Sequence, residues 1–151
     1  MIRSVTEGRQ GGRVARAVLF ARILDRMLAT SPVTTILPVV DADRARDFYD
    51  RVLGLRYAGV SGDGKHLFAI SSGTLALLKK PEPTKAEHTA LSFEVGDVAD
   101  AVRELTGRGV LFDDYDLPGL KTVDKVCILG SEKAAWFKDT EGNILAVIQS
   151  L

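Results

Sequence analysis

The sequence contains few side chains that could perform nucleophilic or metal chemistry. Its 151 residues include one cysteine, Cys127, and two histidines, His66 and His88. Cys127 lies in the apolar segment VCIL without a histidine close in sequence, which is typical of an inert buried thiol. A lone cysteine cannot form an internal disulfide or a multi-cysteine zinc site, and it suits a reducing compartment. The sequence also lacks the phosphate-binding loop, serine hydrolase and zinc protease motifs.

Several aromatic and polar residues could instead contact a small molecule. Trp136 is the only tryptophan, and its flat ring could stack on a planar ligand or anchor the core. His66 and Phe68, on one predicted strand, allow the same two interpretations. His88 and Glu94 share one face of a later predicted strand, because alternate residues of a strand point to the same side. These two residues could supply acid and base groups, or form a displaced metal site together with His66.

The net charge of zero hides an uneven distribution of charge. Residues 1–31 contain six arginines and only two acidic residues, so the rest of the chain is mildly acidic. We therefore expect no nucleic-acid partner. No apolar run approaches the length of a membrane-spanning helix, so we expect no membrane partner either. Together with the cysteine content, these features favour a cytoplasmic protein.

The arginine-rich start of the chain predicts an amphipathic helix over residues 13–29. Three interpretations of this helix are open. It could pack on the domain or on a partner subunit. It could be an artefact of the assigned translation start, if the natural chain begins at Met27. It could also serve membrane-surface binding or targeting. We treat residues 1–31 as an N-terminal extension of a domain that covers 33–151.

Residues 33–80 predict one helix and four strands. The β-branched segment 34–40 predicts a strand, and Asp41 can cap a helix over 43–53 whose apolar residues recur at helical spacing. Three further strands follow, at residues 55–60, 66–71 and 74–79. The segment PEPTK contains two prolines and predicts a linker.

The same order of elements recurs over residues 87–151. The pattern predicts a strand at 88–95, a helix at 98–106 after the cap residue Asp97, and a loop at 116–125. The other predicted strands are 110–115, 126–129, 134–138 and 144–149. An offset of 56 residues places Asp41 on Asp97. We therefore predict an α+β fold of two tandem βαβββ modules, 33–80 and 87–151, whose sheets share a concave surface with the helices outside.

Two segments of this repeat resemble a known family. VVDADRARDFYDRVLGLRY and AWFKDTEGNILAVIQ are similar to the vicinal oxygen chelate superfamily, which includes glyoxalases, extradiol dioxygenases, bleomycin-resistance proteins and fosfomycin-resistance proteins. The resemblance covers residues 33–151, and YDLPGLKT at 115–122 is similar to glyoxalase-like proteins of unassigned role. It implies the paired-module fold. It does not identify an activity, because this fold supports many chemistries.

The metal-ligand positions that this resemblance implies hold residues that bind metal poorly. Metal-dependent members place one ligand on each of four equivalent strands, and the matching residues here are Thr34, Ala76, Ala90 and Ala146. One hydroxyl and three methyl groups cannot replace the nitrogen, sulfur or charged oxygen ligands of a divalent cation. We therefore expect no metal and no other cofactor. This argues against glyoxalase, dioxygenase and epimerase chemistry, which depend on that metal.

Strand alternation predicts which side chains line the concave surface. Residues such as Leu37 and Leu75 face the helices, whereas mostly small side chains face the concavity. A small, largely apolar lining is typical of a small-molecule pocket, although residues such as Ile148 could fill the space as a dry core. Tyr115 and the following loop could close over the surface as a lid.

These observations favour a metal-free protein of the glyoxalase and bleomycin-resistance type that binds an apolar or planar organic molecule. We expect a homodimer, because open sheets leave edges and faces to bury. The candidate ligand-binding residues are Thr34, His66, Phe68, Ala76, His88, Ala90, Glu94, Trp136 and Ala146. One alternative is a glyoxalase- or dioxygenase-like enzyme with a displaced metal or metal-free acid/base chemistry. Another is an interaction module with a filled core. The sequence identifies neither a catalytic residue nor a particular ligand.

Overall fold

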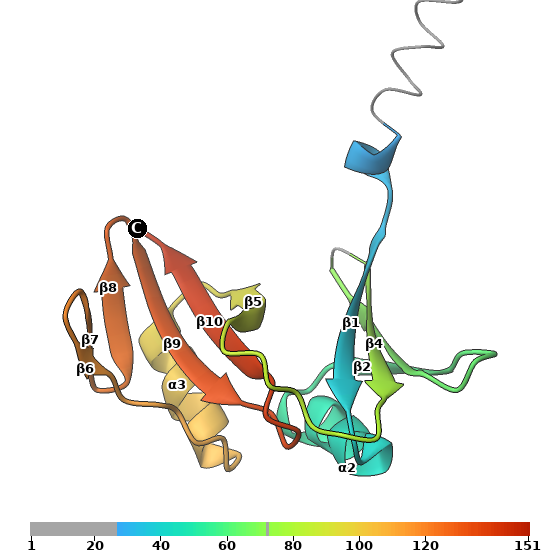
Figure 1. Ribbon diagram of the computed structural model, residues 1–151. Coiled ribbons are helices and arrows are strands. Elements are labelled where there is room, and N and C mark those ends of the chain that lie inside the picture. Colours follow the sequence, from blue (N-terminus) through green and yellow to red (C-terminus); the bar gives the residue numbers. More distant parts are fainter. Residues whose placement is uncertain (1–26, 72) are drawn as a thin grey trace, which may run out of the picture. The chain divides into compact units, whose positions relative to one another are not determined.

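Figure 1 shows the computed structural model, which describes residues 27–71 and 73–151. Contacts divide the chain into two units, Met1–Val33 and Thr34–Leu151. In the first unit the structure describes a short 3-10 helix, η1 (Leu28–Thr30), and the residues that lead to the first strand. The amphipathic helix predicted over 13–29 lies almost entirely outside the described residues, so it stays a prediction.

The first module forms a four-stranded sheet and a short helix. Its elements are β1 (Val33–Val39), α2 (Ala42–Asp47), β2 (Arg56–Val60), β3 (His66–Ile70) and β4 (Gly73–Lys79), and the sheet order is β1-β4-β3-β2. Asp41 caps α2, because its Oδ1 accepts a hydrogen bond from the Arg44 backbone N–H at 3.0 Å. A π-helical turn, η2 (Phe48–Val52), extends α2. Gly54 follows with φ +72° and supplies the left-handed residue that ends the helix.

The second module repeats this order with a wider sheet. Its elements are β5 (Thr89–Glu94), α3 (Val98–Gly107), β6 (Asp116–Leu117), β7 (Leu120–Val123), β8 (Val126–Leu129), β9 (Glu132–Lys138) and β10 (Ile144–Ser150). The sheet order is β5-β10-β9-β8-β7-β6, in which β5 and β10 run parallel. Asp97 caps α3 through the Asp100 backbone N–H at 2.8 Å. No helix in the described ranges is long and apolar enough to cross a membrane.

Two predictions for the second module were wrong. The strand predicted over 110–115 is reduced to a single bridge between Phe112 and Phe137. Phe112 is buried there while its neighbour Leu111 is 84% exposed, so the segment follows the sheet only at one residue. The predicted loop 116–125 contains the hairpin β6–β7, because Gly119 has φ +79° and allows a tight turn between the two strands.

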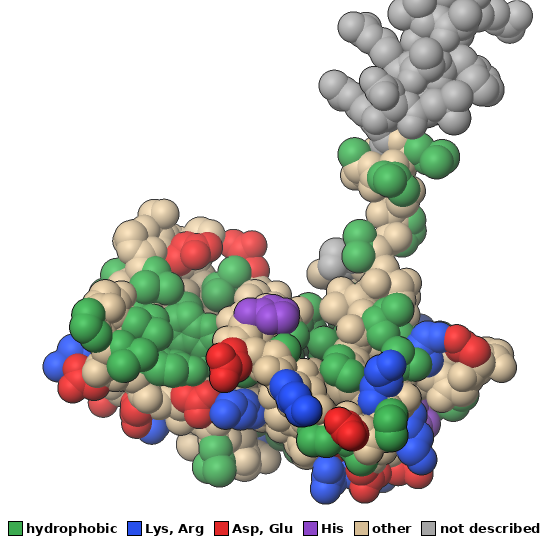
Figure 2. Space-filling model, viewed as in Figure 1, with side chains coloured by type: hydrophobic (Ala, Val, Ile, Leu, Met, Phe, Trp, Pro, Cys, Tyr) green, Lys and Arg blue, Asp and Glu red, His purple; other side chains and the backbone are tan. Residues whose placement is uncertain are grey.

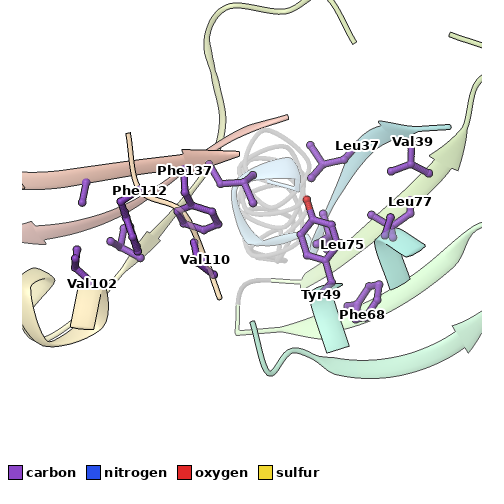
Figure 3. Close-up of a cluster of buried hydrophobic side chains, with 14 of the residues drawn as sticks. Leu37, Val39, Tyr49, Phe68, Leu75, Leu77, Val102, Val110, Phe112 and Phe137 are labelled. Atoms are coloured by element: carbon purple, nitrogen blue, oxygen red, sulfur yellow. The ribbon is translucent and has the colours of Figure 1, made fainter. Parts of the chain in front are cut away.

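The two modules share one hydrophobic core (Figure 3). Alternate strand residues enter it, as the sequence predicts, and six of them are at most 2% exposed: Leu37, Val39, Leu75, Leu77, Leu145 and Val147. Tyr49 of η2 and Phe68 of β3 are fully buried with them. Among the described residues no strand of one sheet pairs with a strand of the other, so the shared core joins the modules. The predicted α+β fold of two βαβββ modules is confirmed.

A buried carboxylate in the turn between β9 and β10 also connects the modules. Glu141 is 4% exposed, and its Oε2 accepts hydrogen bonds from the backbone N–H groups of Val40 at 2.8 Å and Asp41 at 3.0 Å. Its Oε1 accepts from the Arg44 guanidinium at 2.8 Å. Burial by itself would raise the pKa of Glu141, but these backbone and guanidinium donors together lower it.

A second buried carboxylate in this turn holds the first module from another direction. Asp139 Oδ2 accepts the Tyr49 O–H at 2.7 Å, and its Oδ1 accepts the backbone N–H groups of Glu141 and Asn143, each at 2.8 Å. The Asn143 side-chain amide donates to the Pro38 carbonyl at 2.9 Å. Burial, followed by the neighbouring Asp139 charge, raises the pKa of Tyr49, so its hydroxyl stays a donor. The turn thus anchors the end of β1, the start of α2 and Tyr49 to the second module.

Candidate ligand-binding face

The face of the second sheet opposite α3 brings together several predicted ligand-binding residues. Two adjacent rows of side chains cross it, with Ser92, Ala146 and Trp136 in one row and Glu94, Ile148 and Ala134 in the next. We call this surface the open face. Figure 2 shows hydrophobic side chains gathered over β8, β9 and β10, with acidic side chains at one end of the patch. Because alanine and serine are small, the larger residues stand out from this surface.

Trp136 is held in place by two neighbours. Its indole N–H donates to Thr89 Oγ1 at 3.2 Å. The Tyr115 ring meets it edge to face, with centroids 5.6 Å apart and planes at 88°. Tyr115 is itself fixed because its backbone N–H donates to Thr122 Oγ1 at 2.9 Å, and burial raises the pKa of its hydroxyl. The sequence predicts Tyr115 only as part of a lid, whereas the structure places it beside Trp136.

The other end of the open face is acidic. Glu94 lies near the end of β5, and its Oε1 accepts a hydrogen bond from the Ser150 hydroxyl at 3.1 Å. Glu132 is the register partner of Ser150 on β9 and therefore shares the same face. His88 precedes β5 and is exposed. The structure therefore places Glu94 and Trp136 on one face and leaves His88 at its margin.

Two other predicted binding residues lie elsewhere. His66 and Phe68 pair with Leu77 and Leu75 of β4, whose side chains point to the core, so both face the helix side of the first sheet. Phe68 is 0% exposed. His66 Nδ1 lies 2.8 Å from the Tyr57 hydroxyl. Their assignment to a ligand-binding surface is therefore not supported by their positions. Alternation along a strand separates its residues into two sets that face opposite sides of the sheet. The turn before β3 decides which of the two sets faces the core.

The four positions where related proteins place metal ligands do not fit a metal ion. Thr34 is exposed, Ala90 is half-buried, and Ala76 and Ala146 are at most 1% exposed. Methyl groups have no lone pair, so the set offers one neutral oxygen where a divalent cation needs several strong donors. The displaced alternative is not assembled either, because His66 faces the other side from Glu94. Within residues 27–71 and 73–151, no three His, Cys, Asp or Glu side chains cluster as a metal would require.

The single thiol lies on the open face but is sealed from solvent. Cys127 is the register partner of Ala134 and is 2% exposed. Its Sγ contacts only the Ile128 carbonyl, at 3.8 Å, among the hydrogen bonds of the described chain. The burial of Cys127 is what the apolar segment VCIL predicts.

Two grooves border α3 on the helix side of the second sheet. One, of about 700 Å³, lies between α3 and strands β7 to β9 and is lined by Ala99, Val102, Arg103, Lys121, Val123, Asp124, Val126, Ile128 and Lys133. Two of its basic residues are already paired, Arg103 with Asp100 and Lys121 with Asp116. The other groove, of about 510 Å³, lies where residues 53–55 approach β5 and α3, and Glu94 borders it from the sheet edge.

Comparison with known proteins identifies the family. The profile of the Glyoxalase/Bleomycin resistance protein/Dioxygenase superfamily matches residues 31–147. The chain belongs to this superfamily. The resemblance that the sequence motifs indicate is therefore confirmed. No curated protein is significantly similar to the chain in sequence.

Solved structures show the same fold at low sequence identity. A glyoxalase/bleomycin resistance protein from Streptomyces sp. CB03234 is 24% identical with a TM-score of 0.56, over 78% of this chain and 98% of that chain. A glyoxalase/bleomycin resistance protein/dioxygenase from Alicyclobacillus acidocaldarius is 16% identical with a TM-score of 0.59, over 81% of this chain and 92% of that chain. The fosfomycin resistance protein FosX from Listeria monocytogenes, complexed with Mn(II) and 1S,2S-dihydroxypropylphosphonic acid, is 12% identical with a TM-score of 0.58, over 78% of this chain and 88% of that chain.

Proposed function

We propose that this protein binds a planar or apolar organic molecule on the open face, without using a metal ion. The observation that carries the proposal is the position of Trp136. Trp136 is the register partner of Ala146, and Ala146 occupies one of the positions where the resemblance implies a metal ligand in metal-dependent relatives. Because Thr89 and Tyr115 already fix the indole, a ligand that stacks on it loses little binding energy to side-chain ordering.

We also propose that a second copy of the chain covers the open face and turns it into a cleft. Each sheet ends in a strand with an unpaired edge among the described residues, β1 in the first sheet and β5 in the second. Ile36 of β1 is 51% exposed on the side of the sheet away from the core. Exposed apolar residues and open strand edges favour pairing with another chain, and a symmetric dimer buries both at once. A dimeric, metal-free binding protein in the cytoplasm agrees with the composition.

A ligand screen that reports on Trp136 tests the proposal. Since the chain has one tryptophan, its indole N–H gives one NMR signal. Planar aromatic compounds should shift this signal and raise the melting temperature by mass action. By isothermal titration calorimetry, Trp136→Leu should bind the same compounds at least about tenfold more weakly. Ile128→Ala, on the other side of the same sheet, should bind them normally. Equal binding by Trp136→Leu and the unmodified protein would contradict the proposed site.

Elemental analysis tests the metal-free part. Protein purified without chelators should contain far less than one equivalent of any transition metal. A stoichiometric ion would favour the enzymatic alternative, because FosX, a relative in fold, is complexed with Mn(II).

A further inference from the structure

The geometry points to a second binding site, for a medium-chain carboxylate, in the groove of about 700 Å³ between α3 and strands β7 to β9. This inference goes beyond the proposed function, because the groove lies on the helix side of the second sheet and the open face lies on the other side. The volume falls within the range of about 300–1,000 Å³ that is typical of small-molecule sites. The groove combines an apolar floor with basic side chains at one end.

The apolar floor exists because α3 covers only part of this side of the sheet. α3 packs mainly against β9 and β10, so β7 and β8 extend beyond it. Val123 of β7 and Val126 of β8 are register partners, and both line the groove together with Ile128. Val123 is 68% exposed and Ile128 is 65% exposed, so large aliphatic side chains stand in water here. An alkyl chain laid along this floor would remove apolar surface from water.

Lysine side chains flank the apolar floor. Lys133 of β9 is half-buried and is the register partner of Ile128. It forms no ion pair within the described part of the chain. Lys121 of β7 shares a face with Val123, because alternate strand residues point to the same side. Strands β7 and β9 are two strand spacings apart, about 10 Å, so two extended lysine side chains can contact one anion between them.

The other charged groups leave this end of the groove attractive to an anion. Lys121 pairs with Asp116 at 3.4 Å, and Arg103 of α3 pairs with a carboxylate of its own helix. The four side chains in these two pairs are each at least 67% exposed. Ion pairs between such exposed groups contribute at most about 1 kcal/mol, so a bound carboxylate can compete with them. Among the described residues that line the groove, only Asp124 is acidic, and it lies in the turn between β7 and β8, at the valine end of the floor.

Three compounds with the same alkyl chain test the selection of charge. Octanoate, octanol and octylamine present an anion, a neutral hydroxyl and a cation at neutral pH. Their affinities are measured by NMR titration of the isotope-labelled full chain, below the concentrations at which they form micelles. Backbone signals of β7, β8 and α3 should shift, with octanoate binding at least about fivefold tighter than octanol and with octylamine binding most weakly. The octanoate affinity should fall with added salt, whereas the octanol affinity should not.

The alkyl chain is tested separately from the charge. Acetate carries the same carboxylate without the chain, so it should bind at least about tenfold more weakly than octanoate. Val123→Ser removes apolar surface from the floor at an exposed position. It should weaken octanoate and octanol by the same factor, at least about threefold.

Variants of Lys133 test the charge on the protein. Lys133→Gln removes the charge and keeps a polar side chain, so it should lower octanoate affinity at least about fivefold and leave octanol affinity unchanged. Lys133→Glu should reverse the preference and favour octylamine. Lys138→Gln is the matched control, because it makes the same change on the same strand at a position that pairs with Ile144 on the open face. It should bind all the compounds as the unmodified protein does.

Each outcome supports or overturns the inference. Equal affinities of the three octyl compounds, an octanoate preference that survives Lys133→Gln, or an equal loss in Lys138→Gln would overturn it. An absence of shifts in β7, β8 and α3 would do the same. If a second copy of the chain occupies the groove instead, Val123→Ser should dissociate the dimer in analytical ultracentrifugation and octanoate should shift no groove signal. A shift confined to the Trp136 indole signal would place octanoate on the open face, which would overturn the inference and support the proposed function.

Discussion

The two modules repeat one order of elements but differ in whether aromatic residues also lie on the sheet face away from the core. In the first module, Tyr57 and Phe68 face the helix side, with centroids 5.4 Å apart, and Phe68 contacts Tyr49. In the second module, Trp136 and Tyr115 lie on the open face away from the core. The first module buries its rings in the core, whereas the second buries Phe112 and Phe137 and in addition places Trp136 and Tyr115 on the open face. A repeated backbone therefore does not imply a repeated placement of aromatic side chains.

The helix starts of the two modules differ in a similar way. The backbone N–H of Val98 at the start of α3 donates to Gln149 of its own module at 3.2 Å. The backbone before α2 donates to Glu141 of the other module. Among the described residues, the start of α2 is therefore bonded to the other module through a buried charge, whereas the start of α3 is bonded within its own module.

The largest expected effect is the difference in stability between substitutions of Phe68 in the core and of Trp136 on the open face. Phe68→Ala should reduce the free energy of unfolding by about 4 kcal/mol, because it leaves a cavity in the shared core. Trp136→Ala should cost only about 1 kcal/mol, since it removes one hydrogen bond and one ring contact from a half-buried position. Urea unfolding of both variants measures the difference. Similar losses would show that the open face is part of the core.

The next effect concerns the carboxylate that joins the modules. Glu141→Gln should destabilise the protein by about 2–3 kcal/mol, because the amide has one acceptor oxygen and must turn its NH2 group either toward two backbone N–H groups or toward the Arg44 guanidinium, and because the charge that pairs with Arg44 is lost. Glu132→Gln makes the same chemical change on the exposed end of β9 and should change stability by less than about 0.5 kcal/mol. Chemical denaturation compares the two, and equal small effects would contradict the role of Glu141.

Acid should weaken the same connection. The pKa of Glu141 in the folded protein is lowered from its ordinary value of 4.5, so its contribution to stability is present at neutral pH. That contribution is lost as the pH falls below 4.5 and through the folded pKa. The melting temperature should therefore fall less between about pH 6 and about pH 3 in Glu141→Gln than in the unmodified protein. The lowered pKa values of Asp63 and Asp114 are common to both proteins and cancel in this comparison.

A smaller effect should distinguish the two tyrosine hydroxyls of the first module. Tyr49→Phe should cost about 1–2 kcal/mol, because Asp139 loses a donor in a buried site. Tyr57→Phe should cost less than about 1 kcal/mol, since its partner His66 is only partly buried. Thermal unfolding of both variants tests this order, and the reverse order would contradict it.

The smallest effect is expected from a substitution of His66, the histidine of the first module, on the affinity for ligand. His66→Gln should leave the affinity for planar aromatic compounds unchanged, because His66 contacts Tyr57 and Asp43 on the helix side of its sheet. Calorimetric titration of the His66 variant beside Trp136→Leu provides the comparison. A loss of affinity similar to that of Trp136→Leu would place His66 in the site.

The sequence was most informative where a residue acts through its neighbours along the chain. Asp41 and Asp97 cap their helices as the spacing predicts. The alternation of Leu75 and Leu77 predicts their burial. The segment 110–115 was predicted less well, because its β-branched and aromatic residues favour a strand while only Phe112 finds a partner in β9. Local preference is a weak guide wherever a distant strand decides whether backbone groups are paired.

The order of residue types along the chain was enough to predict the two modules and the helix caps. It also showed that Thr34, Ala76, Ala90 and Ala146 are poor metal ligands. These features depend on residue chemistry and on spacing within one element. The tertiary structure alone decided that Phe68 is core and Trp136 is surface, that Tyr115 supports Trp136, and that Glu141 holds the opposite module. Each of these depends on contacts between residues far apart in sequence. Such contacts follow from how sheets and helices pack, which periodicity within a single segment does not specify.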